Sequence, residues 1–512
     1  MIRHTPFCLI TLALTACGGD LESDYVLDLV PHVLSGQAPF EGERVLKLVV
    51  GDAAGETTIS YLGPVNGEAT LDNMPPIAEG GWVGIVVENA GGATGEYNQS
   101  ELVAWGSAAL PEALGLGGQT VEVDVLVAET GKVGDLGSLG DNQVRFNAAG
   151  AITSTGRVVL LCGTEDLLTT IADDRVYQLP TVDAGRWSFD KVGNLPDGGL
   201  IGLRAVSTIV DGQELIVVTG GRFDQSNVGA DSSDSLLIWD PATDSFSYGD
   251  KDNHTNLLVG RSEHAMVAMQ NGRVLIFGGF TNGLTNSIEM FNPKSKAIER
   301  INGEDFGTVY PAGTALGAAG ALLCGGGTVG GESQPSASPV DACNLVNLQG
   351  LVSDGPNLPT RSMGLAMATL ADGRVLVTGG VTTTAAFQSA VPATNAAWLY
   401  NGSTWNTLPQ SMAYPRALHK IVPLPNGDAI VVGGTTYGGG LFARLEEAVT
   451  CPEYFDGKSQ TFSQLPCTGA GAGANPVASW SDTKGGFVLA GEDDLGGSDG
   501  AAFGFIGFPP DL

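Results

Sequence analysis

Short apolar runs that close on glycine recur through the last three quarters of this chain. The clearest is Gly272–Gly279, in which a glycine turn leads into an apolar run that ends in a glycine pair. Runs this short, closed by glycine, predict strands and not helices. The first closing glycines stand about 55 residues apart, a period that indicates a repeat architecture. They are Gly163, Gly220, Gly278, Gly325, Gly379, Gly433 and Gly491.

The surroundings of each run recur with it. An arginine opens an alternating segment 16–18 residues before the closing glycine. A third strand such as Leu236–Trp239 follows the run, and then a turn and a fourth segment that often holds an aromatic residue. Four short strands per unit, punctuated by glycine and proline, predict one blade of a β-propeller. The residues assigned to this structural repeat are Arg145, Arg204, Arg261, Arg361 and Arg416, with Gly220, Gly221, Gly278, Gly279, Gly325, Gly326, Gly379, Gly380, Gly433 and Gly434.

These units resemble kelch repeats. Arg261–His264 and Arg416–His419 match the Arg-x-x-His opening of that repeat, and the double glycine and the later aromatic residue match the rest. The resemblance implies an all-β, seven-bladed kelch-type propeller over residues 143–512, of the galactose-oxidase-like superfamily. Six blades is the alternative, because the first and last units lack the second glycine, although terminal repeats are commonly atypical.

Closure of the ring needs a strand from outside the last unit. That unit offers only a third strand, Ala501–Phe508, and a ring left in this state keeps an unpaired edge. The segment Lys132–Leu136 echoes Lys191–Leu195 at the end of the first unit. We therefore expect residues near 125–136 to close the ring, with residues 131–142 as linker or closing strand.

Residues 25–130 lack the repeat and predict a separate all-β domain. Runs such as Arg44–Val50, Trp82–Glu88 and Val121–Val127 are expected to be strands between glycine, proline and asparagine turns. About five to seven such strands predict a small β-sandwich of immunoglobulin-like or transthyretin-like type. The segment Trp105–Val125 is similar to N-terminal modules of kelch-bearing bacterial lipoproteins, which implies a spacer or a binding unit.

The first 16 residues predict export. Arg3, an apolar run from Phe7 to Leu14 and small residues follow one another as in a secretory signal peptide. Leu14–Cys17 resembles a bacterial lipobox, which implies that Cys17 is lipidated and that several acyl chains anchor the protein. Residues 17–24 would be the tether. Gly18, where aspartate would imply retention in the inner membrane, favours the outer membrane.

The charge of the chain excludes one class of partner. Against 56 acidic residues stand 24 basic ones, for a formal net charge of −32. A nucleic-acid-binding protein needs a basic surface to meet phosphates, so no nucleic acid partner is expected. Contact with a membrane is expected through the lipid anchor alone.

The cysteines predict two disulfides in an oxidising compartment. Cys324 and Cys343 fall in one unit, and Cys451 and Cys467 fall in another. Pairing within each unit would link neighbouring strands. Cys162 is left over inside an apolar strand, where a buried, inert thiol is expected.

Copper is not expected, although kelch propellers include oxidases similar to galactose oxidase. That resemblance implies two tyrosine and two histidine ligands with an adjacent Tyr-His pair, and this chain has no such pair. His264 and His419 fall in the histidine position of the repeat itself, and His32 lies in the N-terminal region. Only His254 remains, and one imidazole does not make a transition-metal site.

Other catalytic patterns are weak, and no catalytic residue is assigned. Gly496–Gly500 matches Gly-x-Ser-x-Gly, but a nucleophile elbow needs a strand before it and a helix after it. The acidic runs Glu492–Asp494 and Asp231–Asp234 follow closing glycines. They lack the spacing that wraps a hard cation, so no cofactor is expected, with Ca²⁺ as the one candidate.

The expected function is binding. A rigid scaffold with variable loops favours a lipid-anchored scaffold for a protein or glycan, without covalent chemistry. The alternative is a carbohydrate-acting enzyme, either a galactose-oxidase-like oxidase or a sialate-mutarotase-like isomerase, with the recurring arginines binding an anionic sugar. Polar side chains from several blades in the central funnel would favour the enzyme, and apolar ones would favour the scaffold.

Overall fold

The computed structural model is an all-β protein in which helical structure is limited to short 3₁₀ turns such as Gly317–Ala319, within the part of the chain described. No helix of the described residues is long and apolar enough to cross a membrane. The structure describes residues 10–12, 26–33, 37–51, 57–64, 82–89, 101–110, 120–130, 133–138, 149–153, 158–161, 175–179, 190–196, 198–222, 232–248, 256–281, 287–301, 306–330, 336–386, 391–438, 448–465, 467, 472–481, 486–492 and 501–507.

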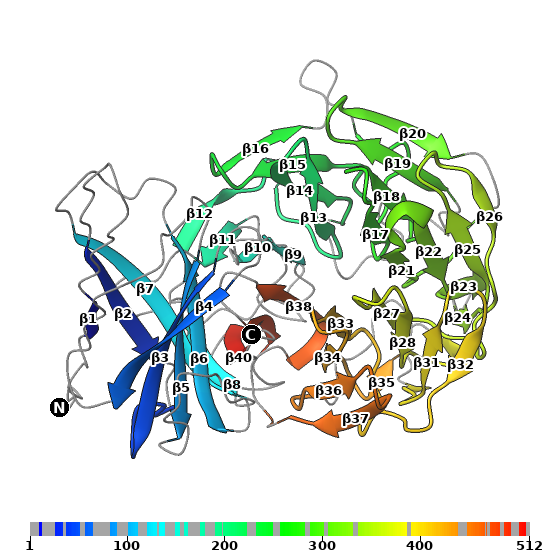
Figure 1. Cartoon of the computed structure of the whole chain (residues 1–512). Coiled ribbons are helices and arrows are strands. Elements are labelled where there is room, and N and C mark those ends of the chain that lie inside the picture. Colours follow the sequence, from blue (N-terminus) through cyan, green and yellow to red (C-terminus); the bar gives the residue numbers. More distant parts are fainter. Residues whose placement is uncertain are drawn as a thin grey trace.

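Among the described residues, seven four-stranded antiparallel sheets make up the larger part of the structure (Figure 1). The first three are β9 (Ala149–Ile152), β10 (Val158–Leu161), β11 (Arg175–Leu179) and β12 (Asp190–Asn194); β13 (Arg204–Val210), β14 (Gln213–Thr219), β15 (Leu236–Asp240) and β16 (Ser245–Tyr248); and β17 (Ala265–Ala268), β18 (Val274–Phe277), β19 (Ile288–Asn292) and β20 (Ala297–Ile301).

The other four sheets continue the same order. They are β21 (Ala312–Ala315), β22 (Ala321–Cys324), β25 (Cys343–Val346) and β26 (Val352–Asp354); β27 (Ala366–Thr369), β28 (Val375–Thr378), β31 (Ala397–Tyr400) and β32 (Trp405–Thr407); β33 (Lys420–Pro423), β34 (Ala429–Val432), β36 (Glu453–Asp456) and β37 (Thr461–Gln464); and β38 (Ala472–Ser481), β39 (Gly486–Glu492), β40 (Ala501–Gly507) and β8 (Val133–Ser138).

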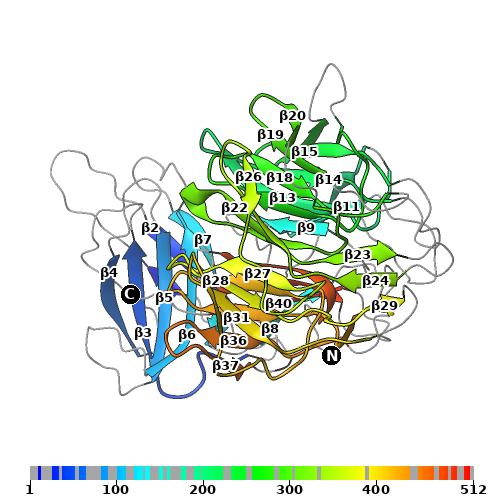
Figure 2. The same cartoon turned by 90° about the vertical axis from the view of Figure 1, so that its right-hand side faces the viewer.

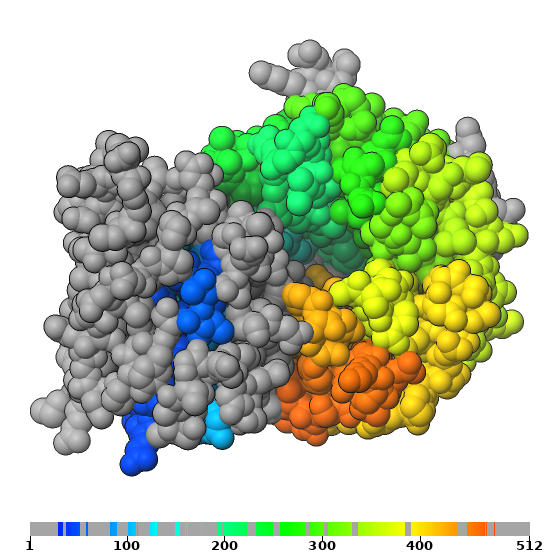
Figure 3. Space-filling model, in the orientation of Figure 1, coloured from blue at the N-terminus to red at the C-terminus, as the bar shows by residue number. Residues whose placement is uncertain are grey.

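The first strands of these sheets meet around a common centre. Each contacts the first strand of the next sheet, and β38 contacts β9, so that the contacts run full circle. Figure 1 shows these strands innermost, with β12, β16, β20, β26, β32 and β37 at the periphery. The space-filling view is hollowed at this centre (Figure 3). We call the first strands the inner strands and the hollow between them the central opening.

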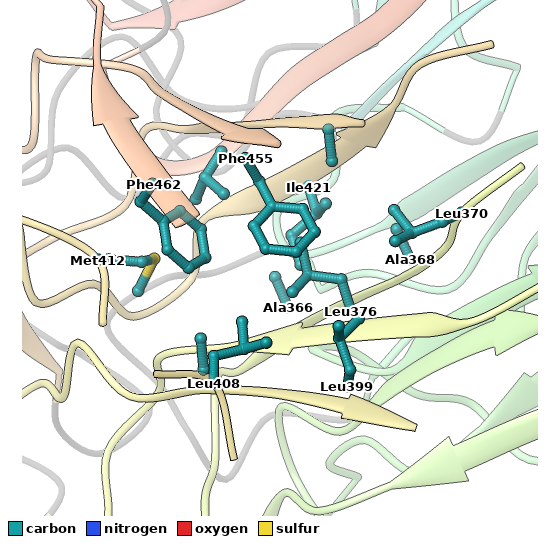
Figure 4. Packing of buried hydrophobic residues seen from close by; sticks show 13 residues of the cluster. Ala366, Ala368, Leu370, Leu376, Leu399, Leu408, Met412, Ile421, Phe455 and Phe462 are labelled. Carbon is teal, nitrogen blue, oxygen red and sulfur yellow. The ribbon is translucent and has the colours of Figure 1, made fainter. Parts of the chain in front are cut away.

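The second strand of each central sheet is buried on both faces. All four residues of β18, β28 and β34 are buried, because a neighbouring sheet packs on each side. Figure 4 shows one such interface, in which Leu376 and Leu399 of one sheet pack against Ile421 and Phe455 of the next. The short continuous apolar run of the repeat is therefore the signature of a strand packed on both sides.

The glycine pairs join each sheet to the next. All ten assigned glycines have positive φ, a conformation in which a Cβ would be strained. The second glycine donates its N–H to the neighbouring sheet, as Gly221 does to the Arg261 carbonyl at 2.8 Å and Gly380 to the Arg416 carbonyl at 2.7 Å. A Cβ on Gly379 would lie 2.3 Å from the Arg416 oxygen. Glycine is therefore required by close approach of two sheets.

The outer strand of the last sheet comes from the N-terminal side of the ring. Strand β8 pairs with β40 antiparallel, with Val133 opposite Ile506 and Ser138 opposite Ala502. Of the residues near 125–136 that were expected to close the ring, 133–136 take this position, whereas 125–129 belong to a strand of the N-terminal sheet. The pairing covers an edge of β40 that would otherwise be exposed.

The N-terminal strands form a seven-stranded sheet in the order β1-β2-β7-β6-β5-β3-β4. The bounds are β1 (Ile10–Leu12), β2 (Val26–Val33), β3 (Arg44–Gly51), β4 (Thr57–Pro64), β5 (Trp82–Asn89), β6 (Leu102–Ala109) and β7 (Thr120–Glu129). Strand β7 pairs with β2 along its length and with β6 only at its end. One buried cluster unites Leu29 of β2 and Val125 of β7 with Leu48 and Ile85 of β3 and β5. The β-sandwich stays a prediction, as do the domain boundaries.

Two small sheets are built from the loops that follow the glycine pairs. Strands β23 (Gly327–Gly330), β24 (Ser336–Pro339) and β29 (Ala385–Ala386) form one, and β30 (Val391–Pro392) with β35 (Tyr437–Gly438) forms the other. Figure 2 shows β23, β24 and β29 on the side of the ring away from β2–β6. We call the end of the ring that bears these loops the loop end.

Both predicted disulfides are confirmed. Cys324 of β22 is bonded to Cys343 of β25, and Cys451 is bonded to Cys467. The first pair lies directly opposite in the strand register, which brings the two residues together without any loop rearrangement. Cys17 and Cys162 lie outside the described residues.

Candidate functional site

Five residues with left-handed backbone conformation precede the inner strands at the loop end. Each stands two residues before its inner strand. The N–H of Glu263 donates to the Gly202 carbonyl at 3.1 Å, and three more such bonds, of 3.3, 3.0 and 2.8 Å, run from sheet to sheet. These residues, which we call the belt, are Gly202, Glu263, Tyr310, Gly364 and Leu418, with φ of 69°, 51°, 50°, 65° and 56°.

Three members of the belt are not glycine. A residue with a Cβ in the left-handed region costs about 1–2 kcal/mol, and such strain persists only where the surroundings impose it. At Glu263, Tyr310 and Leu418 the chain therefore accepts a cost that glycine would avoid at the same position. Strained residues of this kind cluster at functional sites, so these three side chains are candidates for a functional role.

A charged group occupies the part of the belt between the second and third sheets. The Glu263 carboxylate, 1% exposed, accepts from Arg204 Nη2 at 3.1 Å and from Arg222 Nη1 at 3.2 Å through different oxygens. A Cβ on Gly202 would lie 2.5 Å from that carboxylate, so the belt glycine makes room for it. The Arg204 side chain is 20% exposed. Among the described residues, two guanidinium groups share this one carboxylate.

Tyr310 extends this charged group to the fourth sheet. Burial raises the pKa of its phenol, and the negative charge of Glu263 raises it further. The phenol therefore stays protonated at neutral pH and keeps a proton available for donation.

An apolar cluster lies beside this charged group at the loop end. Phe280, Val309, Met363, Val381 and Ala417 form a buried cluster, against which Tyr310 is packed. Val329 of β23 and Val391 of β30 are partly buried against the same cluster. The loop end thus has a charged half on the sheets of β13 and β17 and an apolar half on the sheets of β21, β27 and β33, with Tyr310 between them.

Lys420 adds a cation on the apolar side. It is the first residue of β33 and pairs with Val432, which precedes a closing glycine, just as Arg204 of β13 pairs with Thr219 before Gly220. Arg204 and Lys420 therefore occupy equivalent positions on two inner strands. The Lys420 side chain is exposed, although its neighbours His419 and Ile421 are buried. Surrounding protein nevertheless desolvates the amine and lowers its pKa to about 8.

Arg261 and Arg416, in contrast, form two matching buried ion pairs. Arg261 pairs with Glu289 and Arg416 with Glu453, all four side chains fully buried. Each arginine also donates to a closing glycine carbonyl of its own sheet, at 3.0 Å for Arg261 and 2.8 Å for Arg416. Each glutamate accepts two backbone N–H groups of the segment that enters the sheet. These pairs fasten a segment to its own sheet.

The five arginines of the repeat do not share one position, which corrects the expectation drawn from their spacing. Ser262, Met363 and Ala417 form equivalent bridges, so Ser362 and not Arg361 stands where Arg261 and Arg416 do. Ser362 Oγ indeed bonds the closing-glycine carbonyl of Gly379 at 2.9 Å, and Arg361 is exposed. Arg204 lies four residues further on and reaches the next sheet. Arg145 lies outside the described residues.

The two repeat histidines are structural. His264 Nε2 lies 2.8 Å from Thr219 Oγ1 of the preceding sheet, and His419 Nε2 lies 2.7 Å from Thr378 Oγ1. Burial lowers the pKa of His264 well below its usual value and that of His419 to about 3, with neighbouring arginines adding to the effect. Both rings are therefore neutral links between sheets.

Several sequence candidates fall away from the belt or outside the described residues. Asp234 is exposed. His254, Asp231 and the Gly496–Gly500 segment lie outside the described residues. Cavities of about 510 Å³ beside Asn344 and Asp354, and of about 410 Å³ beside Leu351 and Tyr400, do not include the belt. Neither cavity has a buried charge in its lining, so the belt remains the stronger candidate.

The fold is similar to that of a fungal alcohol oxidase of the AA5 family solved in complex with copper. The identity is 16% and the TM-score 0.52, with 73% of this chain and 75% of that chain covered. A solved structure of YjhT matches at 16% identity and a TM-score of 0.44, covering 64% of this chain and 99% of that chain. No protein-family model and no curated protein matches this chain. The chain has a kelch-type β-propeller fold.

The described residues do not fit copper. They contain no group of three histidine, cysteine, aspartate or glutamate side chains that could hold a metal ion. His264 and His419 belong to different sheets and each is bonded to a threonine. The likeness to the copper oxidase therefore extends to the fold and supplies no ligand set.

Proposed function

We propose that this chain is an exported, lipid-anchored, seven-bladed kelch-type propeller, preceded by a β-sandwich, that binds a glycan at the loop end of its central opening. The seven four-stranded sheets would be the seven blades. The observation that carries the binding role is the belt, where left-handed Glu263 and Tyr310 hold charged and hydroxyl groups beside an apolar cluster.

A pyranose ring suits such a surface. Its hydroxyl edge offers donors and acceptors to Tyr310 and to Arg204, which Glu263 holds in place, while its C–H face can pack on the apolar half. Small-molecule sites are commonly apolar with a few convergent polar groups. A protein partner would instead need roughly 800 Å² of surface on this face, and the belt itself is a small target. The loops of β23–β24 and β30–β35 are where a protein ligand would add contacts.

A glycan array probed with the mature chain, carrying Cys17→Ser to keep it soluble, tests this proposal. We expect binding to a restricted set of glycans, and a loss of about 10–100-fold in affinity in Glu263→Gln, as for a hydrogen bond to a charged group. Tyr310→Phe, which keeps the ring, should weaken binding by less. Arg361→Gln, at an exposed position, should bind as the parent does. An array without hits, or hits that ignore both belt variants, would contradict the proposal.

A second candidate is a sugar isomerase that works by proton transfer. Tyr310, protonated and beside Glu263, supplies a proton donor next to a carboxylate. Nuclear magnetic resonance of the best array ligand would show accelerated exchange between its ring forms on adding the protein. Binding without such acceleration would leave the scaffold role alone.

The anchor can be tested separately. When cells that express the chain are grown with labelled palmitate, the label should be incorporated into the parent protein and not into Cys17→Ser. The labelled protein should be found in the outer-membrane fraction. Labelling of both forms would exclude Cys17 as the lipidation site.

A further inference from the structure

We infer that Lys420 makes the central opening an anion site, and that the ligand bound there carries a carboxylate. This inference rests on the proposed glycan-binding function and deepens it, since it names the charge of the ligand.

The charges of the inner strands carry the first step. Across the seven inner strands, the charged residues are Arg204 and Lys420, both basic and both at the first position of their strand. The chain as a whole has 56 acidic and 24 basic residues. Arg204 is paired with Glu263, so Lys420 is the inner-strand cation without a carboxylate partner among the described residues, in a chain with an excess of acidic residues. A cleft that holds such a cation concentrates anions, because low-dielectric walls focus the field.

The surroundings of Lys420 carry the second step. Strand β33 packs against β27, β34 and β38, and none of these three strands has a titratable side chain. The nearest titratable groups along the chain are His419, which bonds Thr378, and Arg416, which is paired with Glu453. Within the described residues the Lys420 ammonium forms no ion pair, unlike Arg204, which is held by Glu263.

The energetics of that position carry the third step. Desolvation lowers the pKa of Lys420, and among the described residues no carboxylate pairs with its ammonium. Alanine stands at the equivalent position of β17, β21 and β27, so the fold does not require a lysine there. A bound carboxylate would supply the missing counter-charge through a charge-assisted hydrogen bond.

Calorimetric titration with D-glucuronate and D-galacturonate, against glucose and galactose as neutral counterparts, tests the inference. At pH 7 we expect the acidic sugars to bind more tightly than the neutral ones, and Lys420→Met to remove about 10–100-fold of the affinity for the acidic sugars alone. Lys458→Met, in an exposed turn of the same sheet, is the matched control and should change nothing.

The pH profile separates binding from a structural role. Affinity for the acid sugars should fall as pH rises through about 8, because the amine then loses its proton. Lys420→Arg should restore binding and keep it to higher pH, since a guanidinium stays charged. No binding of acidic sugars, or binding that Lys420→Met leaves unchanged, would overturn the inference. If neutral glycans still bind and respond to Glu263→Gln, the proposed function stands and only the anion site is lost.

Discussion

Two kinds of arginine–glutamate pair occur in this propeller, and their arginines stand at similar distances before a closing glycine in the sequence but differ in the structure. Arg261–Glu289 and Arg416–Glu453 are fully buried, repeat the same contacts in two sheets and satisfy the backbone of their own sheet. The Glu263 carboxylate instead pairs with both Arg204 and Arg222, joins two sheets, and leaves Arg204 20% exposed beside the central opening. Repetition with complete burial marks a pair that holds the fold, whereas a partly exposed arginine held by a carboxylate on strained backbone is a candidate for ligand binding.

The largest expected effect is on the buried pairs. Arg416→Met leaves Glu453 buried and without its ion partner, so it should lower the free energy of unfolding by about 3–5 kcal/mol. Denaturant unfolding followed by fluorescence would measure the loss. Arg361→Met, at an exposed position one residue off the repeat register, should stay within about 0.5 kcal/mol of the parent. Equal losses in both variants would mean that burial does not separate them.

The next largest effect is expected from acid, which should weaken the contacts that His264 and His419 make between sheets. His419 has a folded pKa of about 3, below its unfolded value, so the unfolded state binds a proton first as pH falls. Its contribution is therefore fully present above about pH 6.5 and is lost below it, at up to about 1.4 kcal/mol per pH unit. Unfolding free energies measured from pH 7 to 4 should fall less steeply in His419→Gln. An unchanged slope would contradict the neutral, buried ring.

The belt glycines should show a smaller effect. Gly364 has φ of 65°, and a Cβ there would lie 3.2 Å from Leu418. Gly364→Ala should therefore cost about 1–2 kcal/mol of stability. Gly193 of β12 has open space around its Cβ position, so Gly193→Ala should be neutral or slightly stabilising. The melting temperatures of the two variants compare them directly. Equal changes in melting temperature would contradict the claim that the belt requires a left-handed backbone conformation.

Substitution of Lys420 should have the smallest effect on stability, and it tests whether this residue serves ligand binding instead of the fold. The pKa of Lys420 in the folded state lies below its value in the unfolded state, so between about pH 8 and 10.5 the unfolded state binds the proton more readily. At lower pH the amine is charged in both states, and the charge lowers the stability of the folded state. Lys420→Met should therefore raise the melting temperature at pH 7, and the gain should vanish above about pH 10. A lower melting temperature at pH 7 would indicate a structural lysine.

The repeat made much of this fold predictable from the sequence. The glycine pairs recur because two sheets approach too closely for a Cβ, and that requirement is visible in the residue type itself. The disulfides followed from cysteines placed in one unit, and the likeness of Lys132–Leu136 to the first unit pointed to β8.

The belt could not be predicted in the same way. Its five positions hold glycine, glutamate, tyrosine, glycine and leucine, so a shared conformation leaves no shared residue. Arg204 and Glu263 meet across 59 positions of sequence, which no local pattern records. A signal did exist for the arginines, since the two buried ones stand 17 residues before their closing glycine and the two displaced ones stand 16 and 18. In the sequence all of these arginines fall into one group, because their spacing alone does not show which strand position each one occupies.

Hydrogen–deuterium exchange with and without the best array ligand tests the central claim most directly. The account predicts added protection at the segments that enter the inner strands, namely residues 200–204, 261–265, 308–312 and 417–421. Residues 345–351, at the turn beside the cavity lined by Leu351, should exchange as before. Protection confined to that turn, or to the N-terminal strands, would contradict a ligand site at the belt.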